Sequence, residues 1–465
     1  MQINLFKYLL LFVMVLTTAI GSVYSQPSSL AAGAKKFSAD PQLKHATWAM
    51  VVADASTGKI VFDHNGQVGL MPASTLKVLT SVSAFEMLGK TYRYKTVFGY
   101  SGTIANQLLD GDMIISGSGD PSLGSWRYEQ TKPARILDNI IAALNRDGIK
   151  KIKGNIITDT TGWNHEAVPD GWIWQDLANY YGAGAHKINW HENQFDIFLR
   201  SPNQVGAAVE IVSTSPELKG IQLVSMLRAG AKGSGDNAYV YFIPGTSSGL
   251  IRGTIPAGEN RFSISGAHPL PPLQLHEELH AALDMSSIEV EKNNNGVQKE
   301  ELKELYIHQS PPLDSLVYWF MRKSINLYGE AFVKTIGWKN KGEASTSAGV
   351  DFIRSYWEKK GIEADAINIV DGSGLSPQNR ITAMALVQSL QYARKASWYS
   401  SFYESLPVYN GMKLKSGSIN GARAYAGYHK ASNGKEYTIS IMVNNYSGSS
   451  ATVVKKMFQL LDQLK

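Results

Sequence analysis

The stretch Pro72-Ala-Ser-Thr-Leu-Lys77 leads into an apolar run that extends to Leu88 and stops at Gly89. This pattern predicts a helix that begins near Ser74. Ser74 and Lys77 are three residues apart, so in a helix they share one face and the lysine nitrogen can reach the serine oxygen. The spacing therefore predicts a serine nucleophile with Lys77 as its general base.

A lysine that acts as a base must be neutral for part of the time. The positive end of a helix macrodipole, burial and a second nearby cation all lower the pKa of a lysine. The first turn of the predicted helix supplies the first of these effects, and its free backbone N–H groups can bind an oxyanion. The start of this helix is thus a favourable place for acyl transfer.

The Ser-x-x-Lys pattern is not specific by itself, because it occurs at Ser56, Ser74 and Ser432. The first and last copies contain a glycine and lie between strand-like runs, which predicts hairpin turns. Only Ser74 starts an apolar helix. On this pattern alone, a helix N-cap serine beside a solvated lysine remains an alternative.

The composition indicates an exported globular protein. With 465 residues, 44% of them hydrophobic and 18% charged, the chain can form two or three domains with their own cores. Residues 1–25 carry one charge, Lys7, before an apolar run that ends in small residues, which predicts a signal peptide. The chain has no cysteine, which excludes disulfides, thiolate catalysis and a lipoprotein anchor. No later run is long enough for a transmembrane anchor, and a net charge of +6 from scattered residues does not indicate nucleic-acid binding.

The order of patterns predicts a sheet-and-helix unit that is interrupted by β-rich segments. A hairpin at 48–62 precedes the Ser74 helix, and short strand-like runs dominate 92–295. Two similar helix-then-strand units, with helices at 133–144 and 272–283, are expected to belong to one module with 160–258 inserted between them. Further helix patterns cover 313–327, 348–359, 382–393 and 452–464. The final strands, 423–429 and 438–444, are expected to share one sheet with the opening hairpin.

Two more motifs follow. Ser324 and Asn326 form a Ser-x-Asn pair at the end of a helix pattern, which is a weak signal because Ser201 and Ser418 also match it. Lys415-Ser416-Gly417 is more restrictive, since Lys, then Ser or Thr, then Gly occurs once, and its glycine lets a ligand approach a strand edge. Taken singly, a polar helix end and a turn remain alternatives for these motifs.

The order and spacing of the three motifs resemble the active-site set of penicillin-binding proteins and serine β-lactamases. The long interval from Lys77 to Ser324 is similar to that of the class C low-molecular-mass penicillin-binding proteins, the D-alanyl-D-alanine carboxypeptidase/endopeptidase family. Other stretches that resemble this family are 54–63, 117–121, 172–176, 371–375 and 421–427.

The resemblance implies an α+β fold: a transpeptidase-like domain with an antiparallel sheet flanked by helices, and β-rich inserted domains. The expected division is a signal peptide at 1–25, the catalytic domain at 26–95 and 300–465, one inserted domain at 96–160 and 259–299, and a second at 161–258. The implied location is the periplasm. No cofactor is expected.

The resemblance also implies the chemistry. Ser74 attacks the carbonyl of the penultimate D-alanine of a peptidoglycan stem peptide and forms an acyl-enzyme, while Lys77 accepts its proton. Ser324 passes a proton to the leaving amine, and Lys415 lowers the pKa of Lys77 and attracts the substrate carboxylate. β-Lactam antibiotics would be covalent inhibitors.

Other residues are expected to bind substrate. By resemblance, Asn326 binds the substrate amide, and Ser416 offers a hydroxyl where the family often has threonine. The backbone N–H groups of Ser74 and of Ser418, which follows Gly417, form the oxyanion hole.

Side-chain specificity is less well defined by the resemblance. Asp176 and Tyr181 match positions that read a diaminopimelate side chain in relatives. An arginine expected after 372–375 is absent, and Pro377 and Gln378 stand there. The diamino-acid specificity is therefore left open, as is the balance between carboxypeptidase and endopeptidase activity.

Two other chemistries compete with this interpretation. His276-Glu-Glu-Leu-His280 matches the zinc peptidase pattern on a predicted helix, with Glu301 or Glu304 as a third ligand, but Leu275, Leu279 and Leu283 form an ordinary apolar stripe there, so no metal site is expected. A β-lactamase would need a deacylating base, for which the sequence has no specific pattern. A non-catalytic wall-binding protein is disfavoured because all three motifs are intact.

Overall fold

The computed structural model describes residues 28–163, 166–243, 245–292 and 301–465. The expected signal peptide lies outside the described residues. None of the described helices is long and apolar enough to cross a membrane.

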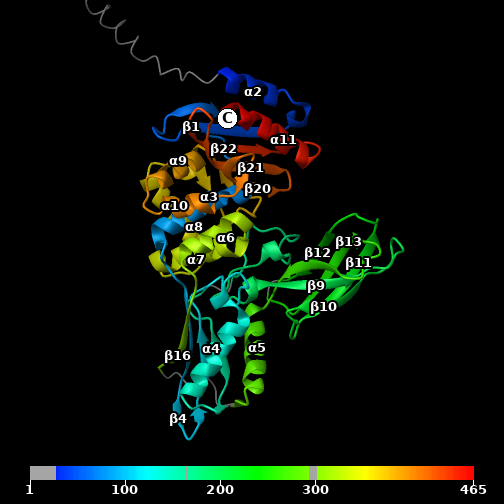
Figure 1. Cartoon of the computed structure of the whole chain (residues 1–465), viewed down its shortest axis with the longest axis vertical. Coiled ribbons are helices and arrows are strands. Elements are labelled where there is room, and N and C mark those ends of the chain that lie inside the picture. Colours follow the sequence, from blue (N-terminus) through cyan, green and yellow to red (C-terminus); the bar gives the residue numbers. More distant parts are fainter. Residues whose placement is uncertain (1–27, 164–165, 244, 293–300) are drawn as a thin grey trace, which may run out of the picture.

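An antiparallel sheet of six strands lies at the centre of the catalytic part (Figure 1). Its order is β19 (Val408–Tyr409), β20 (Met412–Ile419), β21 (Ala422–Lys430), β22 (Glu436–Asn444), β1 (Thr47–Asp54) and β2 (Ile60–His64). β1 pairs with β22 from Thr47↔Asn444 to Asp54↔Tyr437, so the first and last strands share one sheet as predicted. The turns at Ser56 and Ser432 join antiparallel neighbours, which confirms both hairpins.

Helices cover both faces of this sheet, because its central strands carry apolar side chains on both faces. In β1, Met50 and Val52 face one core, while Val51 and Ala53 face the other. The first core is closed by α2 (Ser28–Ser38) and α11 (Ser450–Leu461). The second core is closed by α3 (Leu76–Leu88), α6 (Leu313–Lys323), α7 (Asn326–Lys341), α8 (Thr346–Lys359), α9 (Ala383–Arg394) and α10 (Tyr399–Ser405).

The first inserted module contains two four-stranded sheets and two helices. The strands are β3 (Lys95–Tyr100), β4 (Thr103–Ala105), β5 (Leu108–Asp110), β6 (Met113–Ser116), β7 (Lys151–Lys153), β8 (Ile156–Asp159), β15 (Glu289–Glu291) and β16 (Lys303–Gln309). The helices α4 (Pro133–Arg146) and α5 (Pro271–Met285) share its core, and β15 pairs with β7. The two predicted helix-then-strand units therefore do form one module.

The second inserted module is the arm in Figure 1. One of its three-stranded sheets contains β9 (Gln194–Arg200), β10 (Glu210–Ser215) and β14 (Phe262–Ala267). The other contains β11 (Gln222–Gly230), β12 (Asn237–Phe242) and β13 (Ser248–Pro256). Apolar side chains from both sheets form one core between them.

Strand pairing departs from the expected domain limits at two places. β16 pairs with β3, so 303–309 lies in the first module and not in the catalytic part that was expected to resume at 300. β14 pairs with β9, so 262–267 belongs with the second module. Composition does not specify a strand's distant partner, which is why the sequence misplaced these limits.

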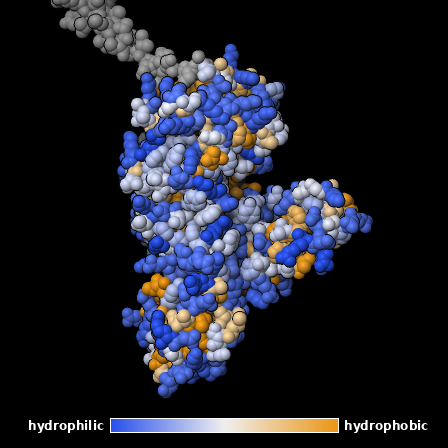
Figure 2. All heavy atoms as spheres, viewed as in Figure 1, coloured by the Kyte–Doolittle hydropathy of each residue, from blue (hydrophilic) through white to orange (hydrophobic). Residues whose placement is uncertain are grey.

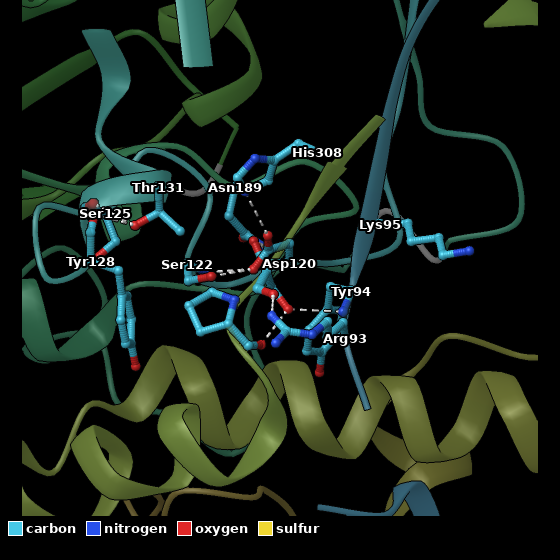
Figure 3. Close-up of polar contacts among 12 residues, drawn as sticks. Arg93, Tyr94, Lys95, Asp120, Ser122, Ser125, Tyr128, Thr131, Asn189 and His308 are labelled. Atoms are coloured by element: carbon cyan, nitrogen blue, oxygen red, sulfur yellow. Dashed lines mark hydrogen bonds and ion pairs between the residues drawn. The ribbon is translucent and has the colours of Figure 1, made fainter. Parts of the chain in front are cut away.

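A buried acid and a buried imidazole lie where the first module meets the catalytic part (Figure 3). Asp120 Oδ1 accepts hydrogen bonds from the backbone nitrogen and hydroxyl of Ser122, whereas Oδ2 has no hydrogen-bond partner among the described residues. His308 Nε2 lies 3.8 Å from Oδ2. Burial raises the pKa of Asp120 to about 6 and lowers the pKa of His308 to about 4.

We expect Asp120→Asn to change the pH dependence of stability. Folded Asp120 holds its proton to a higher pH than the unfolded chain, so its contribution is largest at low pH and is lost as pH rises through about 6. His308 acts in the opposite direction, since its contribution is lost as pH falls through about 4. Asp120→Asn removes the aspartate effect and leaves only the histidine effect. The substitution therefore lowers the free energy of unfolding by about 2 kcal/mol more at pH 4 than it does at pH 7. Urea unfolding of both proteins from pH 4 to 7 measures this, and a difference independent of pH would contradict it.

Candidate active site

Ser74 lies in a short 3-10 turn, η3 (Ala73–Thr75), that continues directly into α3. The sequence predicted Ser74 within the start of the helix itself, whereas α3 begins at Leu76. Ala73 has a left-handed backbone (φ 46°), an unusual conformation for alanine that fixes the bend just before Ser74. Thr75 holds the turn by donating its hydroxyl to the Pro72 carbonyl at 2.6 Å.

Lys77 lies one turn further on and is fully buried. Its Nζ is 2.9 Å from Ser74 Oγ, 2.6 Å from Asn326 Oδ1 and 2.7 Å from the Ser373 carbonyl. The Ser74 hydroxyl is thus paired with the lysine, as the spacing predicted.

The electrostatics around Lys77 favour its neutral form. Burial lowers its pKa well below the usual value, and the positive charge of Lys415 lowers it further. Asp371 and Glu330 oppose these two effects. Of the three causes proposed from the sequence for a lowered lysine pKa, burial and a second cation are therefore both present.

Ser324 and Asn326 lie where two helices meet. Ser324 follows the last residue of α6 and has a left-handed backbone (φ 56°), and Asn326 is the first residue of α7. Asn326 uses both ends of its amide, since Oδ1 accepts from Lys77 and Nδ2 donates to the Tyr181 carbonyl at 2.7 Å. The proton-relay role of Ser324 stays a prediction.

The Lys415-Ser-Gly motif and Ser418 lie on β20 beside the Ser74 turn. β19 pairs only with residues 412 and 413, so no described strand covers the edge from Lys415 to Ser418. A Cβ on Gly417 would collide with the Pro72 carbonyl and lie 3.1 Å from the Ser74 nitrogen, so a glycine is needed for this close approach. Lys415 is buried, which lowers its pKa to about 7, and it donates to the Ser416 carbonyl.

Two buried acids lie under the site, and neither was assigned a role from the sequence, although Asp371 begins the 371–375 stretch that resembles the family. Asp371 accepts hydrogen bonds from Trp172 Nε1, the backbone nitrogens of Gly374 and Ser376, and the Asn379 amide, at 2.7 to 2.9 Å. Glu330 accepts from the Gly372 nitrogen at 3.0 Å, and burial together with Asp371 raises its pKa to about 8. The sequence did contain a signal for Glu330, because this residue lies four residues after Asn326 and hence on the same face of a helix.

We expect Asp371→Ala to lower the free energy of unfolding by about 4 kcal/mol or more. The change leaves three buried donors, Trp172 Nε1 and the Gly374 and Ser376 nitrogens, without an acceptor, each of which costs roughly 1–3 kcal/mol. It should also loosen the segment whose Ser373 carbonyl accepts from Lys77. Asp365→Ala, at an exposed position of the same segment, is the control and should change stability by less than about 0.5 kcal/mol. Chemical denaturation measures both, and equal effects would contradict the role of Asp371.

Asp176 and Tyr181 lie at the edge of the site. The Tyr181 hydroxyl and Asp176 Oδ1 are 3.3 Å apart, and the Tyr181 backbone contacts Asn326. Both side chains are half-buried, and burial raises the pKa of each. Their role in reading a substrate side chain stays a prediction.

The zinc pattern lies on α5 in the first inserted module. The rings of His276 and His280 are 4.6 Å apart, so they share a face as predicted, while Leu275 and Leu279 are buried in the module's core. Within 28–163, 166–243, 245–292 and 301–465, no three His, Cys, Asp or Glu side chains are grouped so that they could hold a metal.

Comparisons with known proteins match this architecture. A model of the family described as "D-Ala-D-Ala carboxypeptidase 3 (S13) family" matches residues 30–411. The D-alanyl-D-alanine carboxypeptidase of Actinomadura sp. (strain R39) is 27% identical over 457 residues, which cover 90% of this chain and 81% of that protein. The D-alanyl-D-alanine carboxypeptidase DacB of Haemophilus influenzae is 24% identical over 418 residues, which cover 85% of each chain. The crystal structure of penicillin binding protein 4 from Haemophilus influenzae has a TM-score of 0.77 at 22% identity and covers 94% of this chain and 99% of its own, which shows the same fold.

Proposed function

Since the chain belongs to the S13 family of D-Ala-D-Ala carboxypeptidases and is a serine D,D-peptidase, we propose that it cleaves peptidoglycan stem peptides through an acyl-enzyme on Ser74. The scissile bond is the one after the penultimate D-alanine. The leaving group is either free D-alanine, in the carboxypeptidase reaction, or the amine of a cross-linked neighbouring stem, in the endopeptidase reaction.

The observation that carries this proposal is the contact of Lys77 with Ser74. A fully buried lysine beside a second buried lysine is neutral at a lower pH than usual, and its nitrogen is 2.9 Å from the serine oxygen. Neutral Lys77 takes the hydroxyl proton as Ser74 Oγ attacks the carbonyl carbon. The backbone N–H groups of Ser74 and Ser418 stabilise the oxyanion that forms.

The leaving amine must gain a proton as its bond to the carbonyl carbon breaks. Ser324, two residues before the Lys77 partner Asn326, passes this proton from the lysine to the nitrogen. Water then attacks the acyl-enzyme with Lys77 again acting as base, and Ser74 is restored.

Substrate recognition follows from the groups around the serine. Lys415 and the Ser416 hydroxyl bind the terminal carboxylate, and Asn326 binds the amide of the penultimate residue. Asp176 and Tyr181 bind the amino end of a diamino-acid side chain. β-Lactam antibiotics, which present a reactive amide next to a carboxylate, acylate the same serine and inhibit the enzyme. The protein works in the periplasm, to which the signal peptide at 1–25 directs it.

The test is release of D-alanine from a peptide that ends in D-Ala-D-Ala, together with cleavage of a cross-linked muropeptide dimer. The proposal predicts activity on one or both substrates, inhibition by penicillin and no effect of EDTA. Activity that EDTA removes and penicillin leaves intact would contradict it.

A further inference from the structure

One face of the β11–β13–β12 sheet is open. Leu223, Leu227, Ile251 and Phe242 point into the core of the module. Because successive side chains of a strand point to opposite faces, the cross-strand register places the other residues of these strands on the open face. They are Gln222, Val224, Met226 and Arg228 of β11, Ser248, Leu250, Arg252 and Thr254 of β13, and Asn237, Tyr239 and Tyr241 of β12. We call this set the arm face. Val224 and Met226 are each 59% exposed, and because they lie two residues apart on β11 their side chains are neighbours on this open face. Figure 2 shows apolar side chains at the surface of this arm.

The arm face begins beside the active site. Tyr241 is buried although it lies on the open side, because Trp174 packs on it with ring centroids 5.7 Å apart. Val240 donates its backbone N–H to Asn179 at 3.1 Å, which ties β12 to the loop that contains Asp176 and Tyr181. The Tyr181 carbonyl in turn accepts from Asn326. The arm face is therefore continuous with the rim of the site that binds the scissile peptide.

The charge on this face has one sign. Arg252 stacks on Tyr241, with its guanidinium carbon 4.3 Å from the ring centroid. On the adjacent strand β11, Met226 lies opposite Arg252, and Arg228 lies two residues further along the same face. No carboxylate lies within ion-pair distance of either arginine in the part of the chain that the structure describes. None of the side chains on the arm face is acidic. Arginine with nearby apolar surface suits an extended ligand that carries both carboxylates and methyl groups.

We propose that the arm face binds the acidic stem peptide of a second peptidoglycan strand, the one joined to or lying beside the strand that is being cleaved. This inference rests on the proposed function. From β12 to β11 the face is about 10 Å wide, so an extended segment of three to four residues spans it. Its carboxylates pair with Arg228 and Arg252, and its alanine methyl groups contact Val224, Met226 and Leu250. The arm would then favour cross-linked polymer over short linear peptides.

The test compares small and polymeric substrates in charge-reversed proteins. Arg228→Glu with Arg252→Glu is the variant, and Arg200→Glu with Arg261→Glu, at the end of β9 and just before β14 in the same module, is the control with the same net charge. Thermal unfolding checks that both remain folded. Each is assayed on a short peptide that ends in D-Ala-D-Ala, on a purified cross-linked muropeptide dimer and on isolated sacculi, at two salt concentrations.

The arm-face variant should retain full kcat/KM on the short peptide and lose at least tenfold on the dimer and sacculi, with most of the loss in KM. The control pair should keep activity on all three. Val224→Ser with Met226→Ser should lower dimer cleavage without altering its salt dependence. Equal cleavage of the dimer by wild type and the arm-face variant would overturn the inference, as would an equal loss in the control pair. Failure of wild type on the short peptide and dimer alike would instead overturn the proposed function.

Discussion

Ser74→Ala abolishes peptide hydrolysis and penicillin acylation, with kcat/KM falling by about 10⁴-fold or more, because no other group can form the acyl-enzyme. The fold should be unchanged. Lys77 retains Asn326 and the Ser373 carbonyl as partners, and Ser74 caps no helix, so the cost in the free energy of unfolding is about 1 kcal/mol or less. Steady-state kinetics and thermal unfolding measure the two effects.

Ser432→Ala is the matched control for this prediction. Ser432 has the same Ser-x-x-Lys spacing, but it lies in the turn between β21 and β22. This variant should keep wild-type activity and wild-type acylation. Hydrolysis by Ser74→Ala at more than about 1% of the wild-type rate would remove Ser74 as the nucleophile.

The pH profile of kcat/KM should be bell-shaped, and Lys415→Met should remove one of its limbs. Activity rises as Lys77 loses its proton, because the base must be neutral. Activity falls as Lys415 loses its proton, with a pKa of about 7 in the free enzyme, because the cation binds the substrate carboxylate. Without the charge at 415 the pKa of Lys77 rises, so the rising limb moves to higher pH and the falling limb disappears. At pH 7 Lys415→Met should lower kcat/KM by about 100-fold or more, since the substrate carboxylate loses the buried cation with which it pairs.

Lys415→Arg separates charge from shape. Arginine stays protonated, so the falling limb should disappear while the rising limb stays near its wild-type position. A Lys415→Met profile that keeps both limbs at their wild-type positions would show that Lys415 neither tunes Lys77 nor binds the carboxylate.

Local sequence predicted the residues that meet at the site because each motif has its own local structure. Ser74 and Lys77 lie on one helical turn, Lys415 lies on a strand before a hairpin, and Ser324 lies at a helix end. The turn residues at Ser56 and Ser432 separated the hairpin copies of the Ser-x-x-Lys pattern from the copy at Ser74.

Features that depend on distant contacts escaped prediction. The pattern at 313–327 was expected to be one helix, but α6 ends at Lys323 and α7 begins at Asn326, because Ser324 takes a left-handed backbone. The rest of α7 was not predicted at all. Its residues from Asn326 to Gly337 are buried on every side, so no apolar stripe marks them. The contact of Asp371 with Trp172, which is 199 residues away, likewise could not be predicted from local sequence.

The most direct test of the account is the intact mass of the protein after incubation with penicillin, with and without EDTA. We expect one penicillin bound per chain, on the peptide that contains Ser74, at the same level in both samples. Rapid penicillin hydrolysis without a lasting adduct would indicate a β-lactamase. No adduct, together with peptidase activity that EDTA removes, would move the chemistry to His276 and His280 and contradict the account.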